Sequence, residues 1–195
     1  MKRALFISVV WLFLAFSTTG SACVNLDINV GAIDSAEGQL FAHVVSIFIH
    51  ERTGTKALIK YYSTDKELHS AIAEKQVELI LVDINEVLLV RGQKVAAEST
   101  ERYEAAKAIY RDDMQLILLE SIVPAVGADS MRSGTFSPAL AQVVLEKFPA
   151  LPRLLNKLVG KIDPVTNATL LDLVKEKGHK PARVAKDFLV KEKLI

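Results

Sequence analysis

Five polar side chains that could bind a small ligand follow two apolar runs that are expected to form strands. Asp83, Asn85 and Glu86 come at the end of one run, and Ser35 and Glu37 follow another. Backbone N–H groups at a helix start near Ser35 could attract a carboxylate, and the acids could offset the charge of an ammonium group. The alternative is that all five residues are only helix caps and turn residues. These five are the candidate ligand-binding residues of the sequence.

The elements that would position these residues alternate between strand and helix. Three apolar runs predict strands, and the two segments between them have helical spacing. In chain order these segments are Leu26–Ala32, Glu37–Arg52, Ala57–Tyr62, Asp65–Gln76 and Val77–Ile84. This order predicts an α/β fold with a mostly parallel sheet flanked by helices. In such a sheet a ligand lies beyond the carboxyl ends of the strands, which is where the five polar residues are placed.

The rest of the chain adds one more strand and several helices. The sequence predicts a short helix at Val87–Val90, a long helix at Glu98–Asp112 and a fourth strand at Met114–Leu119. Ser121–Thr135 contains proline and glycine among small residues, which is typical of a connection or hinge. The last third is predicted to be helical. Its four helices are expected to begin near Ser137-Pro138, Leu151, Asp163-Pro164 and Pro181.

Residues 1–22 have the pattern of a secretory signal peptide. Lys2 and Arg3 precede the apolar run Ala4–Phe16, and small and polar residues follow at Ser17–Ala22. Thirteen helical residues span about 20 Å, less than the roughly 30 Å core of a bilayer, so export is favoured over a membrane span. The alternative is an uncleaved amphipathic or buried helix. We expect residues 23–195 to form a single α/β domain in the periplasm or another extracytoplasmic compartment.

Cys23 follows the expected cleavage site and is the only cysteine of the chain. Gly20-Ser21-Ala22 suits cleavage by signal peptidase before Cys23. The position also suggests a bacterial lipoprotein in which Cys23 carries the lipid anchor, although Gly20 stands where the usual lipoprotein box has a Leu-like residue. Otherwise Cys23 is a free thiol, and a single cysteine cannot form an internal disulfide.

Composition and motifs argue against a nucleic-acid-binding protein and against an enzyme. Residues 1–22 hold two basic residues and no acid, which leaves 22 Lys and Arg against 23 Asp and Glu. Nothing in this nearly neutral chain forms a basic face for nucleic acid. The sequence has no Gly-rich phosphate loop, nucleophile elbow or metal-ligand cluster, and Ser130 and Ser133 have no histidine nearby. The sequence therefore predicts neither catalysis nor a bound cofactor.

Several segments together resemble a known family. They are Val30-Gly31, Glu78–Asp83, Phe148–Leu151, Leu154–Ile162 and Gly178–Leu189, the last reading Gly-His-Lys-Pro-Ala-Arg-Val-Ala-Lys-Asp-Phe-Leu. This pattern resembles the substrate-binding proteins of ABC transporters for glycine betaine, choline and related osmoprotectants. The resemblance implies one Rossmann-like lobe of a type 2 periplasmic-binding-protein fold with a C-terminal helical segment.

The family has two lobes, and this chain is too short at the place of the second. Only about residues 121–136 stand there, so we expect a single lobe with a shortened crossover. The resemblance implies an exported, degenerate solute-binding component for glycine betaine or a related osmoprotectant. Its partners would be an ABC transporter permease and a small quaternary-ammonium or amino-acid-like ligand.

Two departures from the family concern the ligand site. Quaternary ammonium groups are usually held over aromatic faces, best of all Trp, and the only Trp of this chain, Trp11, lies in the leader. Glu86 is followed by Val87-Leu88-Leu89 where the family tends to carry a Tyr-Thr-Gly turn. The alternative function is therefore an interaction or dimerisation protein of the periplasm that has lost ligand binding. A homodimer could rebuild a two-lobed cleft from two copies.

Overall fold

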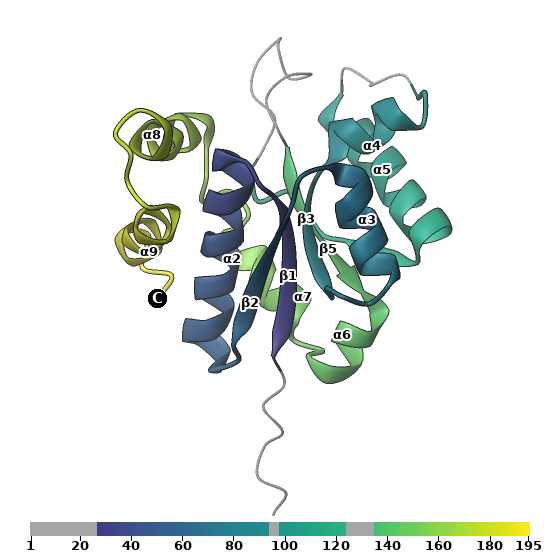
Figure 1. Cartoon of the computed structure of the whole chain (residues 1–195), viewed down its shortest axis with the longest axis horizontal. Helices are drawn as coiled ribbons and strands as arrows, with labels where there is room; N and C mark the ends of the chain where they lie inside the picture. Colours follow the sequence, from purple (N-terminus) through teal and green to yellow (C-terminus); the bar gives the residue numbers. More distant parts are fainter. Residues whose placement is uncertain (1–26, 94–97, 124–134) are drawn as a thin grey trace, which may run out of the picture.

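The chain folds into three layers, with a five-stranded sheet between two groups of helices (Figure 1). The computed structural model describes residues 27–93, 98–123 and 135–195. The elements are, in chain order, β1 (Ile28–Ile33), α2 (Ala36–Thr53), β2 (Ala57–Tyr62), α3 (Asp65–Ala73), β3 (Leu79–Asp83), α4 (Ile84–Val90), α5 (Ser99–Met114), β4 (Leu116–Leu118), β5 (Phe136–Ala141), α6 (Gln142–Lys147), α7 (Leu151–Leu155), the 3₁₀ helix η2 (Asn156–Leu158), α8 (Pro164–Lys175) and α9 (Pro181–Lys191).

The sheet has the strand order β2-β1-β3-β5-β4. β1 pairs in parallel with β2 and β3, whereas β5 runs antiparallel to both β3 and β4. Four strands therefore point the same way and only β5 points the other way. This confirms the predicted α/β fold with a mostly parallel sheet. The carboxyl ends of β1, β2 and β3 share one edge of the sheet, and β5 begins at that same edge.

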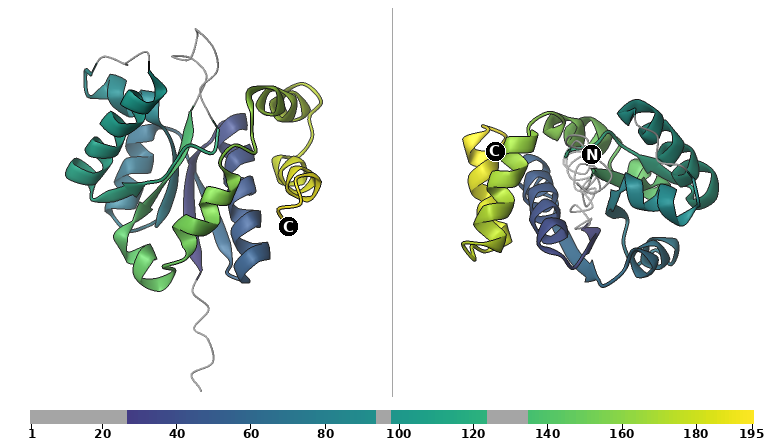
Figure 2. Two further views of the ribbon diagram at one scale, coloured as in Figure 1. Left: turned by 180° about the vertical axis from the view of Figure 1, so that it is seen from behind. Right: turned by 90° about the horizontal axis from the view of Figure 1, so that it is seen from above.

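Both faces of the sheet are covered by helices, which explains the unbroken apolar run of β3. Leu79 and Leu81 belong to the core that β3 shares with α2 and the C-terminal helices. Ile80 and Val82 belong to the second core, which lies under α3, α4 and α5. Figure 2 shows the two helical layers on opposite sides of the sheet. Burying each such side chain stabilises the fold by roughly 1.5–3 kcal/mol.

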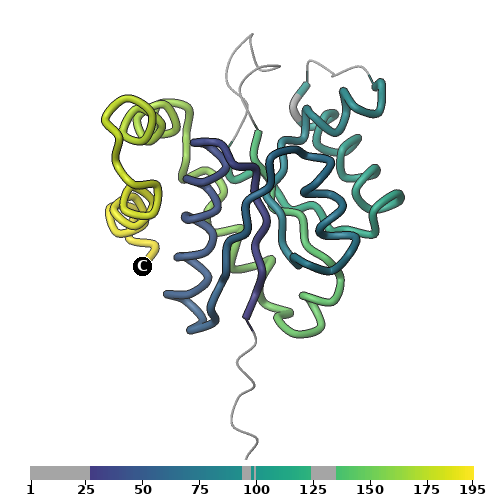
Figure 3. Tube along the Cα trace, viewed as in Figure 1, coloured from purple at the N-terminus to yellow at the C-terminus, as the bar shows by residue number. Residues whose placement is uncertain are grey.

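The C-terminal helices pack against α2, far from them in the sequence (Figure 3). Phe41 and Phe48 of α2 share one core with Val184 and Phe188 of α9. α8 and α9 begin at Pro164 and Pro181, as the sequence predicts. In the described part of the chain no helix is both long and apolar enough to cross a bilayer.

Several predictions fall on residues outside the described ranges. The signal peptide at residues 1–22 and the lipidation of Cys23 concern residues before Asp27. Most of the shortened crossover at residues 121–136 also lies outside, although its two ends are described. These statements stay predictions.

The prediction of a helix that begins at Ser137-Pro138 is wrong. These two residues lie in β5, and the helix α6 begins only at Gln142. Ser137 pairs with Val82 and Pro138 with Leu81 in the register of β5 on β3. The two-sided burial of this strand outweighs the local preference of a Ser-Pro pair for a helix start.

Pro138 fits inside the sheet because its nitrogen faces the end of a short strand. Ala141 N donates to Glu78 O at 2.9 Å, and Ile84 N donates to Thr135 O at 3.3 Å, so odd-numbered residues of β5 bond to β3. Pro138 therefore faces β4, and its carbonyl accepts from Leu119 N at 2.8 Å. Pro138 has no N–H group to donate, and its nitrogen lies opposite Leu119, one residue past the end of β4. The hydrogen bonds between β3 and β5 are therefore complete.

Gly38 allows the first turn of α2 to approach the end of β1 closely. A Cβ atom at this position would lie 2.1 Å from the carbonyl oxygen of Ile33, which is too short for any real contact. In the same turn, Ser35 N donates a hydrogen bond to Ile33 O at 2.8 Å. The glycine therefore sets how the chain passes from β1 into α2.

Gly38→Ala should lower the free energy of unfolding by about 1–3 kcal/mol, because the Ile33 carbonyl has to move to admit the methyl group. At an open helix position the same change would raise stability by up to about 1 kcal/mol. Chemical denaturation measures the difference, with the exposed change Glu51→Ala in the same helix as control. A stabilised Gly38→Ala variant would contradict the close approach.

Candidate functional site

One carboxylate joins three elements at the carboxyl edge of the sheet. Asp83 ends β3 and is the N-cap of α4, where its Oδ1 accepts a hydrogen bond from Asn85 N at 2.9 Å. The same oxygen accepts from Thr135 N, just before β5, at 3.4 Å. Asp83 thus ties the end of β3 to the starts of α4 and β5.

Burial raises the pKa of Asp83 from 3.8 to about 6. The two backbone hydrogen bonds lower this pKa, and the nearby charges of Glu86 and Asp65 raise it. Asp65 is the first residue of α3, so it follows the carboxyl end of β2. Asp65, after the end of β2, and Glu86, after the end of β3, therefore both act on Asp83, although β1 lies between these two strands. We call Asp65, Asp83 and Glu86 the acidic cluster.

A buried tyrosine and a histidine lie beside the acidic cluster. His69 Nε2 is 3.3 Å from the hydroxyl of Tyr110, and the two ring centres are 5.8 Å apart. Burial lowers the pKa of His69. Burial, followed by the charges of Asp65 and Asp83, raises the pKa of Tyr110. Both rings are therefore neutral at pH 7, and neither supplies a positive charge to the acids.

A hollow of about 430 Å³ opens between α3 and α4 next to the acidic cluster. Asp65, His69 and Glu86 line it together with apolar Val87 and Val90. Two basic residues are also part of its wall: Lys66, and Arg91, which forms an ion pair with Asp113 at 2.8 Å. Its volume lies in the range of sites for small organic ligands, which is about 300–1,000 Å³. One small molecule in the hollow could therefore contact acidic, basic and apolar side chains.

The structure separates the five predicted site residues into two groups. Asp83, Asn85 and Glu86 lie together at the start of α4, and Asn85 is only 2% exposed. Ser35 and Glu37 lie at the start of α2, which covers the opposite face of the sheet (Figure 1). Whether either group binds a ligand stays a prediction.

Ser35 and Glu37 have structural contacts in place. The Ser35 hydroxyl accepts from Gly38 N at 3.0 Å, which makes Ser35 the N-cap of α2. Glu37 Oε1 lies 3.2 Å from Lys175 Nζ of α8. Ser35 and Asp83 are thus both helix N-caps, and the alternative that all five residues are only caps and turn residues stays open.

Two residues of this edge were not among the predicted site residues. Asp65 was expected only as part of a helix, although its place directly after a strand was the signal that could have singled it out. Thr135 is 4% exposed, and its Oγ1 has no hydrogen-bond partner among the described residues. No pattern in the sequence marks Thr135. No group of three or more His, Cys, Asp or Glu side chains within the described ranges is arranged to hold a metal ion.

Comparison with known proteins places the fold. No protein-family model and no curated protein matches the sequence. A crystal structure of a glycine betaine/carnitine/choline ABC transporter protein superimposes with a TM-score of 0.76 over 86% of this chain and 98% of that chain. The chain has the fold of a single periplasmic-binding-protein lobe. This confirms the predicted fold class, although the identity to that protein is only 12%.

A second solved structure, apo YehZ from Escherichia coli, gives a TM-score of 0.72. The match covers 87% of this chain and 100% of that chain, with 13% sequence identity. At such low identity, the two similarities establish the fold alone.

Asp83→Asn should make the folded chain more stable at pH 8 and leave it almost unchanged at pH 4. Because the folded pKa is raised to about 6, protonation of Asp83 favours folding, and this contribution is lost as the pH rises from 3.8 towards 6. The gain at pH 8 should be about 1–3 kcal/mol, since Asn can still accept both backbone hydrogen bonds. Urea unfolding at the two pH values measures it.

Asp163→Asn is the matched control, because Asp163 also caps a helix but is exposed. The hydrogen bond from Thr166 N, at 2.7 Å, lowers the pKa of Asp163. Its ionised form therefore stabilises the fold, and Asp163→Asn should reduce stability at pH 8. The same sign of change in both variants would contradict the burial of the Asp83 charge.

Proposed function

We propose that this chain is an exported solute-binding protein that takes a small cationic or zwitterionic molecule of the betaine or choline class. The observation that carries the proposal is the fold, which matches a glycine betaine/carnitine/choline ABC transporter protein over 98% of that chain. Solute release to an ABC transporter permease would follow from such a role. The signal-peptide pattern of residues 1–22 supports a periplasmic or other extracytoplasmic location.

The charges of the carboxyl edge suit this class of ligand. Asp65 and Glu86 line the hollow between α3 and α4 and can face an ammonium group. Lys66 in the same wall can face the carboxylate of a betaine-like zwitterion. A single lobe leaves the ligand open to solvent on one side, so we propose weak binding, as expected of a degenerate member of a two-lobed family.

Thermal unfolding of the purified chain with glycine betaine, choline, carnitine, proline betaine and free amino acids tests the proposal. A ligand at a hundred times its dissociation constant should add about 2.7 kcal/mol to the free energy of unfolding. For a domain of this size, each kcal/mol of added stability raises the Tm by roughly 2–4 °C. No shift with any solute would refute direct binding.

For any solute that shifts the Tm, Glu86→Gln should raise the dissociation constant about tenfold. A tenfold change corresponds to a loss of about 1.4 kcal/mol of binding free energy, which we expect for one charge next to the ligand. Glu86 is exposed, so the variant should keep the stability of the parent chain. Titration calorimetry measures the affinity. Glu176→Gln, at the exposed end of α8, is the control and should bind like the parent. Equal loss in both variants would place the ligand elsewhere.

A second candidate function is supported by two exposed apolar residues near the carboxyl edge. Leu89 and Val90 of α4 are 50% and 71% exposed, and Val90 lines the hollow beside the acidic cluster. Under this hypothesis the surface that a second lobe would cover joins two copies of the chain or docks on another exported protein.

Sedimentation of the purified chain separates the two candidates. If α4 forms a homodimer contact, Val90→Glu should convert the dimer to monomer, because the new charge would be buried without a partner. Val165→Glu, at a similarly exposed valine of α8, should leave the dimer intact. A chain that is monomeric at all accessible concentrations would refute the homodimer.

A further inference from the structure

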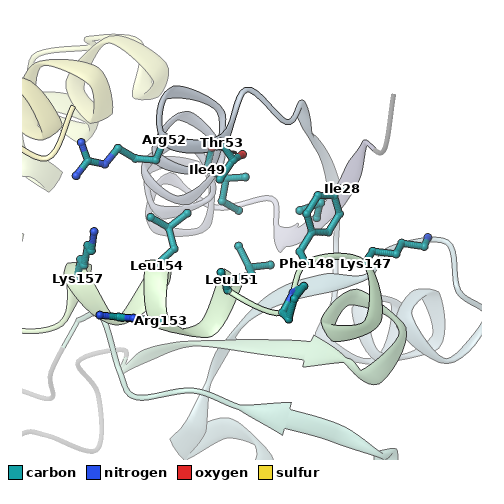
Figure 4. Close-up of a pocket in the computed structure, with 12 residues that line it drawn as sticks. Ile28, Ile49, Arg52, Thr53, Lys147, Phe148, Leu151, Arg153, Leu154 and Lys157 are labelled. Atoms are coloured by element: carbon teal, nitrogen blue, oxygen red, sulfur yellow. Dashed lines mark hydrogen bonds between the residues drawn. The ribbon is translucent and has the colours of Figure 1, made fainter. Parts of the chain in front are cut away.

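A groove lies at the opposite end of the sheet from the acidic cluster, where β1 begins. Its volume is about 490 Å³, and it runs between the last turns of α2 and the segment from α6 to η2 (Figure 4). Ile28, the first residue of β1, is part of its wall. The groove is thus built from the amino end of the sheet and shares no residue with the hollow between α3 and α4.

The floor of the groove is apolar. Ile49 of α2 and Leu151 and Leu154 of α7 face one another across it, and Phe148 closes one side (Figure 4). Leu154 and Phe148 are half-buried, so part of their surface is open to a ligand. An extended hydrocarbon chain would cover this surface and remove it from water.

Basic side chains stand at both ends of this floor. Arg52, Arg153 and Lys157 gather at one end, and Lys147 lies at the other (Figure 4). No acidic residue lines the groove. Lys147 Nζ lies 3.6 Å from Glu78 Oε1, whereas the other three form no ion pair within the described part of the chain. Three cations beside an apolar floor therefore carry no compensating charge, and an anion bound there would supply it.

This combination fits an amphiphilic anion. A hydrophilic anion would leave the apolar floor exposed, and a neutral apolar ligand would leave the three cations uncompensated. An anionic phospholipid matches both parts, because its acyl chain is apolar and its phosphate accepts hydrogen bonds from arginine in bidentate geometry.

We propose that this groove docks the domain on a membrane surface by binding one anionic phospholipid. An acyl chain lies along the half-buried Phe148 and Leu154, above the buried Ile49 and Leu151. The phosphate lies among Arg52, Arg153 and Lys157. The position in the chain supports a membrane as the source of the lipid. Cys23, which would carry the lipid anchor if the chain is a lipoprotein, precedes Ile28 by only five positions. Five residues reach at most about 17 Å, so an anchored N-terminus would hold the groove near the bilayer.

Flotation of the chain with lipid vesicles tests the proposal. The chain should bind vesicles of phosphatidylcholine with phosphatidylglycerol at least tenfold more strongly than vesicles of phosphatidylcholine alone, and added salt should weaken this difference. Because each basic side chain near an anionic surface contributes roughly fivefold, Arg52→Glu with Lys157→Glu should abolish the preference. All variants carry the same N-terminus, so any affinity of the leader for vesicles is common to them.

The control is Lys75→Glu with Lys107→Glu, which changes the net charge equally on the other side of the sheet. This control should keep the preference for phosphatidylglycerol. Leu154→Ser should weaken binding several-fold and retain its salt dependence, because only the acyl contact is lost. If the Glu variant of the groove unfolds, Arg52→Gln with Lys157→Gln replaces it.

Three outcomes would overturn the proposal. They are equal binding to both kinds of vesicle, an equal loss in the groove variant and its control, and an undiminished preference in the groove variant. Equal binding to both kinds of vesicle would indicate that the groove binds an acidic protein segment instead of a lipid. None of these results bears on the solute site, since the two hollows lie at opposite ends of the sheet.

Discussion

The pairing of β5 with β3 is the constraint on which the rest of the structure depends. β3 is buried on both faces, so each of its backbone N–H and C=O groups has to find a partner inside the sheet. β1 supplies these partners on one side, and β5, from beyond the crossover, supplies them on the other. Asp83 reinforces the arrangement by holding Thr135 N at the start of β5. Without β5, β4 would have no strand to pair with and the second core would be open to water.

The two ends of the sheet differ in charge. At each end, charged side chains lie next to apolar ones. At the carboxyl edge, Asp65 and Glu86 act on the half-buried Asp83, which keeps a proton to a higher pH than an exposed aspartate does. At the amino end, Arg52, Arg153 and Lys157 stand around an apolar floor. Under the two proposals, a small solute would approach the carboxyl edge and an anionic lipid would approach the amino end. The domain would then face a solute on one side and a membrane on the other.

Local patterns were sufficient to predict much of the fold, but long-range pairing was not visible in them. The bounds of β2 at Ala57–Tyr62 follow from its apolar run, and Ser35 is of a residue type that favours helix caps. Ser137-Pro138 was misassigned because a Ser-Pro pair suits a helix start, yet the residue before a proline also prefers an extended backbone. The acidic cluster was found only in part, because Asp65 and Asp83 meet through the order of β2, β1 and β3, which sequence spacing does not reveal.

The bridge between Val123 and Phe136 affects which insertions and deletions such a domain can tolerate in evolution. Ile122 N donates to Phe136 O at 2.9 Å, so the two ends of the crossover are fastened side by side at the sheet edge. Once its ends are fixed, a connecting segment can lengthen at little energetic cost, about 0.6 kcal/mol for each doubling of its length. A whole module could be inserted or deleted between these two points while the five strands keep their register.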